Sequence, residues 1–241
     1  VAAGDFDTGR DLKSYPTAKL EGRRMAVLGY GNIGREVAKL GRAFGMDVVV
    51  YARAKHRQWI EAEGFDYAQT PLEAAKGADV LSVHVGLGRL DAESHTYANA
   101  GIVGEAVLSA MNRGAVVLNY DRGEVVDVSA LDRAITSGQV RHAAIDADLF
   151  KNTTSGVLSG PMQPYLKLAE RHPGNLELLP HAAADTDHPS RVAGACQAVD
   201  QMIDVIRHRR VTNLKGALPE GYVDAGAKVP HGIGRVTTAT L

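Results

Sequence analysis

Gly29, Gly31 and Gly34 have the Gly-x-Gly-x-x-Gly spacing with which a protein backbone can bind phosphate groups. The spacing alone is weak evidence, because a chain with 26 glycines can contain it by chance or as an ordinary turn. Here, however, the apolar run 24–28 precedes it, a helical pattern follows it, and a second apolar run at 46–51 comes one helix later. This context predicts a strand, a turn and a helix that together bind a dinucleotide.

Each part of the turn has a distinct predicted role. Gly29 would permit the tight turn, Gly31 would let a pyrophosphate approach the backbone, and Gly34 would let the helix pack closely on the strand. The first amides of the helix, at Asn32 and Ile33, would face the phosphates, where the helix dipole favours negative charge. We therefore expect these five residues to bind the cofactor.

The end of the second expected strand, 47–51, indicates which dinucleotide is bound. The acidic residue that would bind the adenosine ribose hydroxyls of NAD is absent, since the next residues are Ala-Arg-Ala-Lys-His-Arg. Arg53 can accommodate a 2′-phosphate, and Lys55 and Arg57 could add charge. We predict NADP(H) in preference to NAD(H); the alternative is a solvated basic turn with NAD as cofactor.

Three polar side chains follow three further apolar runs: Arg122, Asp146 and His181. The arginine or the histidine alone would be interpreted as a surface loop residue. Parallel strands bring their carboxyl ends to one edge of a sheet, where ligands bind, so the three form a candidate site. His84 also ends an apolar run, but a structural histidine is the favoured interpretation there.

The spacing of these runs predicts an α/β fold, a doubly wound parallel sheet of the Rossmann dinucleotide-binding type. The pattern alternates strands with helices and contains no internal repeat. We expect strands at 24–28, 47–51, 79–85, 115–119, 141–146 and 176–179, and helices at 33–40, near 59–60, from 71, at 101–111 and at 129–137.

The later part of the chain is less regular. Residues 147–174 contain scattered glycines and prolines and are expected to form a functional or mobile loop with a short helix at 165–171. A long helix should follow, with Cys196 and Met202 in the core; its apolar face comprises Val192, Cys196, Val199, Met202, Ile203 and Ile206. The expected organisation is a connecting arm (1–20), a dinucleotide-binding domain (21–213) and a tail (214–241).

Composition limits the partners and the compartment. The formal net charge is −1, from 27 basic and 28 acidic residues, which gives no general reason to expect nucleic acid or an acidic membrane as a partner. The single cysteine excludes an internal disulfide and a multi-cysteine metal site, so we expect no metal and a cytoplasmic location. No apolar run reaches membrane-spanning length. Because the chain starts at Val1 without an initiator Met, we expect it to begin inside a longer gene product.

Several of these segments closely resemble the D-isomer-specific 2-hydroxyacid dehydrogenase family. The resemblance covers about residues 19–213 and rests on the spacing of the glycine turn and of three segments, Val-Leu-Asn-Tyr-Asp-Arg-Gly-Glu-Val-Val-Asp at 117–127, Ala-Ile-Asp at 144–146 and Leu-Pro-His-Ala-Ala at 179–183. It implies an oxidoreductase that transfers a hydride between NAD(P)H and a small 2-oxo or 2-hydroxy acid, and a homodimer.

The resemblance also implies a role for each polar residue of the candidate site. Arg122 matches the arginine that holds the substrate carboxylate and polarises its carbonyl, and a guanidinium fork suits that bidentate contact. His181 matches the general acid/base, which needs a pKa near neutrality. Asp146 matches the carboxylate that hydrogen-bonds the nicotinamide carboxamide.

Two departures from the family pattern leave alternatives open. Lys151 stands where a glutamate should orient the histidine, and Asp148 is a possible substitute. The N-terminal lobe of the family, which forms half of the substrate cleft, is expected to be absent from this chain. A non-catalytic, dinucleotide-sensing regulator of the corepressor kind is therefore a second hypothesis, and a domain that binds cofactor only for stability is a third. Retention of Arg122 and His181 favours chemistry.

Overall fold

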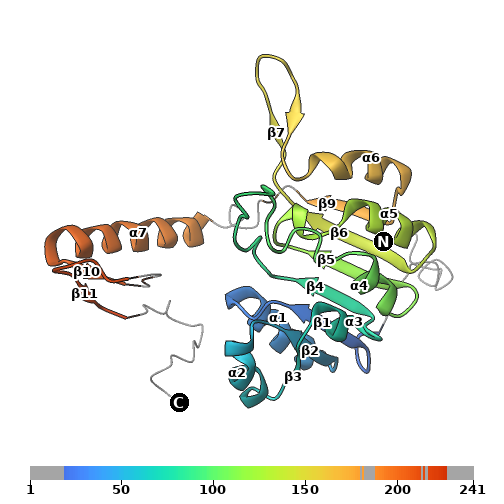
Figure 1. Cartoon of the computed structure of the whole chain (residues 1–241), viewed down its shortest axis with the longest axis horizontal. Coiled ribbons are helices and arrows are strands. Elements are labelled where there is room, and N and C mark those ends of the chain that lie inside the picture. Colours follow the sequence, from blue (N-terminus) through green and yellow to red (C-terminus); the bar gives the residue numbers. More distant parts are fainter. Residues whose placement is uncertain (1–18, 180, 182–187, 213, 215–216, 227–241) are drawn as a thin grey trace, which may run out of the picture. The chain divides into compact units, whose positions relative to one another are not determined.

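A computed structural model describes residues 19–179, 181, 188–212, 214 and 217–226 (Figure 1). Its main feature is a seven-stranded parallel sheet with the strand order β3-β2-β1-β4-β5-β6-β9. The strands are β1 (Arg24–Leu28), β2 (Asp47–Tyr51), β3 (Asp66–Ala68), β4 (Val80–Val83), β5 (Ala115–Asn119), β6 (Val140–Asp146) and β9 (Leu176–Leu179). The predicted doubly wound α/β fold is confirmed.

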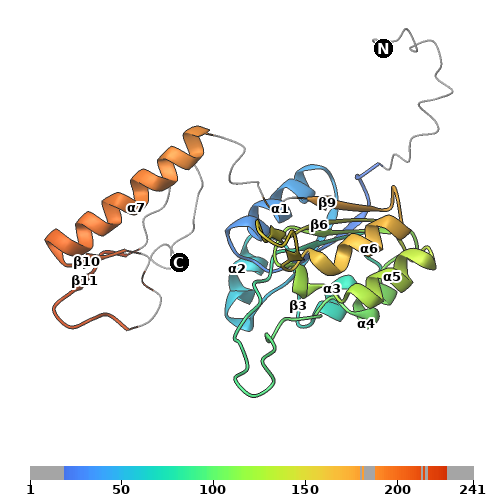
Figure 2. The same ribbon diagram turned by 90° about the horizontal axis from the view of Figure 1, so that it is seen from above.

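Helices cover the two faces of this sheet. On one face, α3 (Pro71–Ala75), α4 (Glu105–Ala110), α5 (Val128–Thr136) and α6 (Gln163–Arg171) pack in sequence against one another. On the other, α1 (Asn32–Ala43) lies against β1 and β2 (Figure 2). A short 3₁₀ turn, η2 (Ala54–His56), leads into α2 (Arg57–Ala62), and a second, η3 (Gly123–Val125), follows β5.

The core is divided by the sheet into two layers. Alternate residues of a strand point to opposite faces, so Ala26 and Leu28 of β1 join the cluster under α3–α6, whereas Met25 and Val27 join the cluster under α1 and α2. Because both faces are buried, β1 and β2 are almost uninterrupted apolar runs, which is typical of parallel sheets.

Helix α1 contacts the sheet through small residues, which differs from the apolar stripe in its sequence. Its buried residues are Gly34, Ala38 and Gly41, while Ile33 and Leu40 are exposed. A Cβ atom on Gly41 would lie 2.8 Å from the sulfur of Met25 and 3.2 Å from a methyl group of Val48, so a larger residue there would require these side chains to shift. The sequence pattern predicted the helix; of its apolar residues, Val37 packs against the core while Ile33 and Leu40 are exposed.

Other elements differ from the expected bounds in ways that local contacts explain. Helix α4 begins four residues later than predicted, because Val103 pairs with Val126 in an isolated bridge before the helix starts. The short strand β3 was not predicted. The irregular segment after β6 contains an antiparallel hairpin of β7 (Phe150–Lys151) and β8 (Leu158–Ser159), also unpredicted, which projects from the sheet (Figure 1).

The described residues from 188 onward form a separate compact unit. It contains α7 (His188–His208), β10 (Arg210–Val211) and β11 (Val223–Asp224), the two strands being parallel partners. The long helix was predicted, but assignment of Cys196 and Met202 to a core is wrong in the described structure, where Cys196 is exposed and Met202 is 60% exposed. The domain boundaries at 20 and 213 remain predictions, and residues 1–18 of the predicted arm lie outside the described residues.

None of the helices within the described ranges is both long and apolar enough to cross a membrane.

Candidate functional site

The predicted site residues all follow strands of the parallel sheet at its carboxyl edge. Register pairs align the strand ends: Leu28 is opposite Tyr51 and Val83, and Asn119 is opposite Val83 and Ile145. The glycine turn therefore lies at the same edge as the segments after β2, β4, β5, β6 and β9. In open α/β sheets this edge is where ligands bind.

The three glycines occupy three different environments in the turn. Gly29 has φ +102°, and a Cβ there would overlap the carbonyl of His84 at less than 3.0 Å. A Cβ on Gly34 would overlap the carbonyl oxygen of Gly29, whereas a Cβ on Gly31 would meet no atom within 4 Å. Gly29 and Gly34 are thus required by the fold itself, and Gly31 leaves open space beside the backbone. That space suits a pyrophosphate.

A cavity of about 560 Å³ adjoins the turn. Gly29 and Gly31 lie on one side, Arg53 and His56 line it after β2, and Arg89 lines it after β4. No carboxylate is found among the described residues that line it. Its basic side chains and glycine backbone fit the phosphate groups of a dinucleotide.

Two of the basic residues predicted to support Arg53 do not line this cavity. The Nε of Arg57 donates to Glu61 at 2.8 Å, and its guanidinium lies over the ring of Tyr67. Lys55 is exposed and is also absent from the lining. Lys55 and Arg57 therefore do not contact this space directly, and His56 and Arg89, which sequence reasoning missed, line it.

A carboxylate from α2 holds the turn in place. The hydroxyl of Tyr30, between the first two glycines, donates to Glu63 at 2.6 Å, and the Nε of Arg35 in α1 donates to the same oxygen at 2.9 Å. Burial and then the hydrogen bond to Glu63 raise the pKa of Tyr30, so its hydroxyl stays protonated. This network connects the turn to the first turn of α1.

His84 is a structural residue of the cavity wall. Its Nε2 and the hydroxyl of Ser82 are 2.8 Å apart in a hydrogen bond, and burial lowers the pKa of the ring to about 4. The ring is therefore neutral at physiological pH and is not suited to exchange protons with a substrate there. This agrees with the structural role expected from the sequence.

Buried polar groups brace the loop that carries Arg122. The side chain of Asn119, fully buried at the end of β5, donates to the carbonyl of Arg122 at 3.0 Å and accepts from the amide of Asp121 at 3.2 Å. From α6, the hydroxyl of Tyr165 donates to the carbonyl of Gly123 at 2.6 Å. These contacts fix the backbone on both sides of the arginine.

The guanidinium of Arg122 faces a carboxylate of its own chain. Its Nη1 lies 3.5 Å from Oδ2 of Asp148, at the base of the β7–β8 hairpin. Asp148, the suggested substitute for the histidine-orienting glutamate, therefore pairs with the arginine. Lys151 lies within β7.

Asp146 is the carboxylate beside His181. Its Oδ1 accepts a hydrogen bond of 2.6 Å from the His181 amide, and its Oδ2 lies 3.9 Å from Nδ1 of the ring. The carboxylate is almost fully buried, whereas the histidine side chain is about one-third exposed. Asp121 completes the cluster; burial raises the pKa of its carboxyl, against the opposing charges of Arg122 and His181. The site thus combines a cation for an acid with a partly exposed imidazole backed by a buried carboxylate.

Comparison with known proteins identifies the family of the chain. The family model described as "D-isomer specific 2-hydroxyacid dehydrogenase, NAD binding domain" matches residues 1–183. The chain belongs to this family.

Curated and solved relatives of this dehydrogenase-family chain are substantially longer than the chain itself. The glyoxylate reductase of Aeropyrum pernix is 30% identical over 196 residues, which cover 81% of this chain and 52% of the relative. The D-3-phosphoglycerate dehydrogenase of Methanocaldococcus jannaschii is 28% identical over 204 residues, covering 85% and 35%. A structure of D-lactate dehydrogenase from Aquifex aeolicus, complexed with NAD and lactic acid, matches with a TM-score of 0.60 and 27% identity, covering 78% and 55%. The chain spans about half or less of the length of these relatives.

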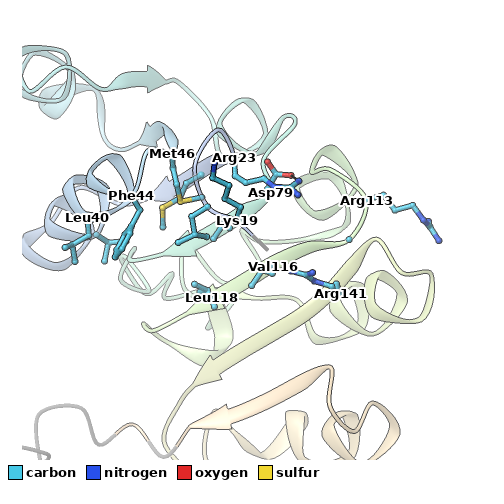
Figure 3. Close-up of a pocket in the computed structure, with 16 residues that line it drawn as sticks. Lys19, Arg23, Leu40, Phe44, Met46, Asp79, Arg113, Val116, Leu118 and Arg141 are labelled. Carbon is cyan, nitrogen blue, oxygen red and sulfur yellow. Dashed lines mark hydrogen bonds and ion pairs between the residues drawn. The ribbon is translucent and has the colours of Figure 1, made fainter. Parts of the chain in front are cut away.

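A second hollow, of about 570 Å³, lies away from this site on the face of the sheet that α1 covers (Figure 3). We call it the α1-face hollow. Leu40, Phe44 and Met46 line it from α1 and the following loop, and Val116 and Leu118 line it from β5. Its lining is mostly apolar, and the carboxyl-edge residues described above do not contribute to it. It is therefore not the candidate active site.

The functional residues that the sequence did not reveal carried weak signals. Asn119 is the polar last residue of an apolar run, which could have indicated a loop brace. His56 lies within the basic segment 52–57, where the arginines and the lysine were considered instead, and Arg89 lies in a polar loop. Tyr165 is one of two aromatic residues in the irregular segment 147–174. Their positions depend on which loops meet, and periodicity does not contain that information.

Proposed function

We propose that this chain is the cofactor-binding part of an NADP(H)-dependent oxidoreductase that reduces a small 2-oxo acid to the 2-hydroxy acid. The observation that supports this most directly is the placement of Arg122, and of His181 beside buried Asp146, on the same sheet edge as the glycine-turn cavity. A cation, a proton carrier and a dinucleotide cavity are what such a reaction requires.

Each residue has a defined task in the reduction. The cofactor, when bound at the glycine turn, supplies the hydride that adds to the carbonyl carbon of the acid. Arg122 binds the carboxylate and polarises the carbonyl, which requires its guanidinium to turn from Asp148 to the substrate. Protonated His181 donates its proton to the carbonyl oxygen as that oxygen becomes a hydroxyl, and Asp146 stabilises the imidazolium before transfer.

Preference for NADP(H) follows from the charges of the cavity. Arg53 and His56 line it beyond β2, where NAD-specific sites place a carboxylate for the ribose, and the described lining contains none. Titration of the chain with NADPH and NADH should give tighter binding of NADPH. Arg53→Ala should weaken NADPH about tenfold or more, as expected for loss of a charge-assisted hydrogen bond, with little effect on NADH. Lys76→Ala, at an exposed lysine after α3 that does not line the cavity, is the matched control. Tighter binding of NADH would refute the preference.

We further propose that this chain alone binds the dinucleotide but reduces 2-oxo acids poorly. The side chain of Arg122 is 51% exposed, so a bound carboxylate would remain open to water, which weakens the electrostatic contribution. Misplacement of the acid by about 1 Å can cost roughly a hundredfold in rate. The test measures cofactor affinity and 2-oxo acid reduction for this chain and for the full-length gene product. Equal turnover by both would contradict the proposal.

A non-catalytic, dinucleotide-sensing regulator is the second candidate. Two observations favour it: Lys151 stands where the glutamate was expected, and the guanidinium of Arg122 forms an ion pair with Asp148. The two candidates differ in one measurement on the full-length product, the oxidation of NADPH on addition of glyoxylate, pyruvate or hydroxypyruvate. Oxidation that requires His181 supports the enzyme. Cofactor binding without oxidation of any 2-oxo acid supports the regulator.

We also propose a cytoplasmic location, because a chain with one cysteine suits a reducing compartment. We propose in addition that two copies of the chain form a dimer through the α1-face hollow. Leu40 and Phe44 at this hollow are 57% and 62% exposed, and burying such apolar side chains between two copies would favour association. Light scattering should give a dimer for the unmodified chain and a monomer for Phe44→Glu. The similarly exposed Phe150, on the hairpin, is the control: Phe150→Glu should stay dimeric. A monomeric unmodified chain would exclude this interface.

A further inference from the structure

The cavity beside the glycine turn contains a titratable group that the cofactor assignment has not used. His56 ends η2, three residues after Arg53, and its amide donates to the carbonyl of Arg53 at 2.8 Å. In a 3₁₀ turn, positions i and i+3 lie on the same side. Both residues accordingly line the cavity, whereas Lys55 and Arg57, which flank His56 in the sequence, do not.

The surroundings of His56 favour its neutral form when no anion is bound. Burial is the largest cause of its lowered pKa, followed by the charges of Arg53 and Lys55 on its own segment. Across the cavity, the loop after β4 contributes Arg89, a further cation, and His84, which is neutral. From α2 the ring of Trp59 lies edge-on at 5.3 Å, and the described cavity lining contains no carboxylate.

We propose that His56 is a specificity-determining residue that binds the 2′-phosphate of NADP(H) together with Arg53 and takes up a proton as it does so. The inference rests on the proposed NADP(H) preference and adds to it a second residue and a dependence on pH. A phosphate dianion between the two side chains would reverse the repulsion that His56 experiences from Arg53. The imidazolium then becomes a charge-assisted donor to the phosphate.

The direction of proton exchange on binding distinguishes protonation of His56 from a change in the protonation of the phosphate. A phosphate monoester has a second pKa of about 6, so at pH 7.5 it is almost entirely dianionic. Binding among cations lowers that pKa further, which can only release protons. Net uptake of protons must therefore come from the protein. Affinity should rise as the pH falls from 8.5 toward about 6.5, and decline again below the pKa of the phosphate.

The experiment compares two small probes that differ by the 2′-phosphate: adenosine 2′,5′-bisphosphate and adenosine 5′-monophosphate. Calorimetric titration of the full 241-residue chain at pH 7.5, in two buffers of different ionisation enthalpy, gives the protons exchanged with each probe. We expect uptake with the bisphosphate and none with the monophosphate. His56→Asn should abolish the uptake and weaken bisphosphate binding about tenfold or more, while leaving the monophosphate unchanged. The matched control, His208→Asn, lies in α7 and should change neither.

A spectroscopic signal provides a second readout. Trp59 is the single tryptophan of the chain and contacts the ring of His56, so its fluorescence, quenched by imidazolium, reports the protonation of that ring. The midpoint of the pH titration should move upward when the bisphosphate is added and should not move in His56→Asn. An unmoved midpoint in the unmodified chain would overturn the inference.

The outcomes distinguish this inference from the proposed function on which it rests. If the bisphosphate binds no more tightly than the monophosphate at any pH, the NADP(H) preference itself is wrong. If the bisphosphate binds more tightly, and Arg53→Ala removes that advantage, but uptake is absent or persists in His56→Asn, the preference stands and the role of His56 is wrong.

Discussion

Replacing Gly31 and Gly34 by alanine, one at a time, separates what the fold requires of the glycine turn from what a ligand requires. A Cβ on Gly34 would overlap the carbonyl oxygen of Gly29 and would lie 3.3 Å from the Cβ of His84. Overpacking of this kind costs about 1–3 kcal/mol. In a unit of this size each kcal/mol of lost stability lowers the Tm by about 2–4 °C, so the Tm of Gly34→Ala should be several degrees lower.

Gly31→Ala should behave in the opposite way. Gly31 is the N-cap of α1 with φ −82°, which any residue can adopt, and its Cβ would meet nothing within 4 Å. The gain from a less flexible unfolded chain, about 0.4–1 kcal/mol, is offset by the poorer capping of alanine. Stability should therefore change by less than about 0.5 kcal/mol. The new methyl group would occupy the space predicted for the pyrophosphate, so NADPH affinity should fall at least about tenfold, or 1.4 kcal/mol.

The assay combines thermal unfolding of the cofactor-free chain with NADPH titration by fluorescence. Gly194→Ala, in α7, is the control for cofactor affinity, because its Cβ also meets nothing within 4 Å. It should leave NADPH affinity unchanged while stabilising its helix by about 0.5–1 kcal/mol. Binding of NADPH by Gly31→Ala at the level of the unmodified chain would refute the predicted position of the pyrophosphate. An unchanged Tm for Gly34→Ala would refute the packing argument.

Three other substitutions or conditions test the rest of the site. In the full-length product, Arg122→Lys keeps the charge but loses the fork, so 2-oxo acid binding and turnover should both fall while NADPH affinity stays nearly intact, as steady-state kinetics and titration will show. His181→Ala should depress kcat by about 10² to 10⁴, and near-normal turnover would disprove its role as acid/base. Burial lowers the pKa of His84 to about 4, so between about pH 6.5 and 4 the unfolded state binds more protons than the folded state. The free energy of unfolding should therefore fall by up to about 3 kcal/mol as the pH drops through that window. Urea unfolding at pH 7 and pH 4.5 measures this loss, and His84→Asn should show a smaller one.

Elements defined by local pattern were predictable. The strands at 47–51, 115–119 and 176–179 have the predicted bounds, because each is a short run of mainly apolar, β-favouring residues. Sequence also predicted the turn at Gly29–Gly34, since two of its three glycines, Gly29 and Gly34, are required by the backbone geometry. Local conformational preference and burial act in the same direction at these places.

Contacts between distant segments were not predictable. The face that α1 buries is decided by how closely the helix approaches β1, and the small residues Gly34, Ala38 and Gly41 permit an approach that a stripe of larger residues would prevent. Likewise, the pairing of Arg122 with Asp148 depends on the path of the chain after β6, which positions the base of the hairpin near the loop after β5. Neither feature has a signal in hydrophobic periodicity.

Strand order also explains why the site has two electrostatic halves. All strands of the sheet run parallel, but the chain adds β2 and β3 on one side of β1 and β4 on the other. β1 and β2 therefore deliver the glycine turn, Arg53 and His56 to one side of the edge. β5, β6 and β9 deliver Arg122, Asp146 and His181 to the other side, with carboxylates close to both the arginine and the histidine. The basic surface on the first side suits phosphates. The second side suits a histidine that gains and loses a proton, because a carboxylate lies beside it. A dinucleotide that lies across the point where the strand order reverses would place its phosphates in the first half and its reacting ring in the second. Open α/β sheets bind dinucleotides at such a point.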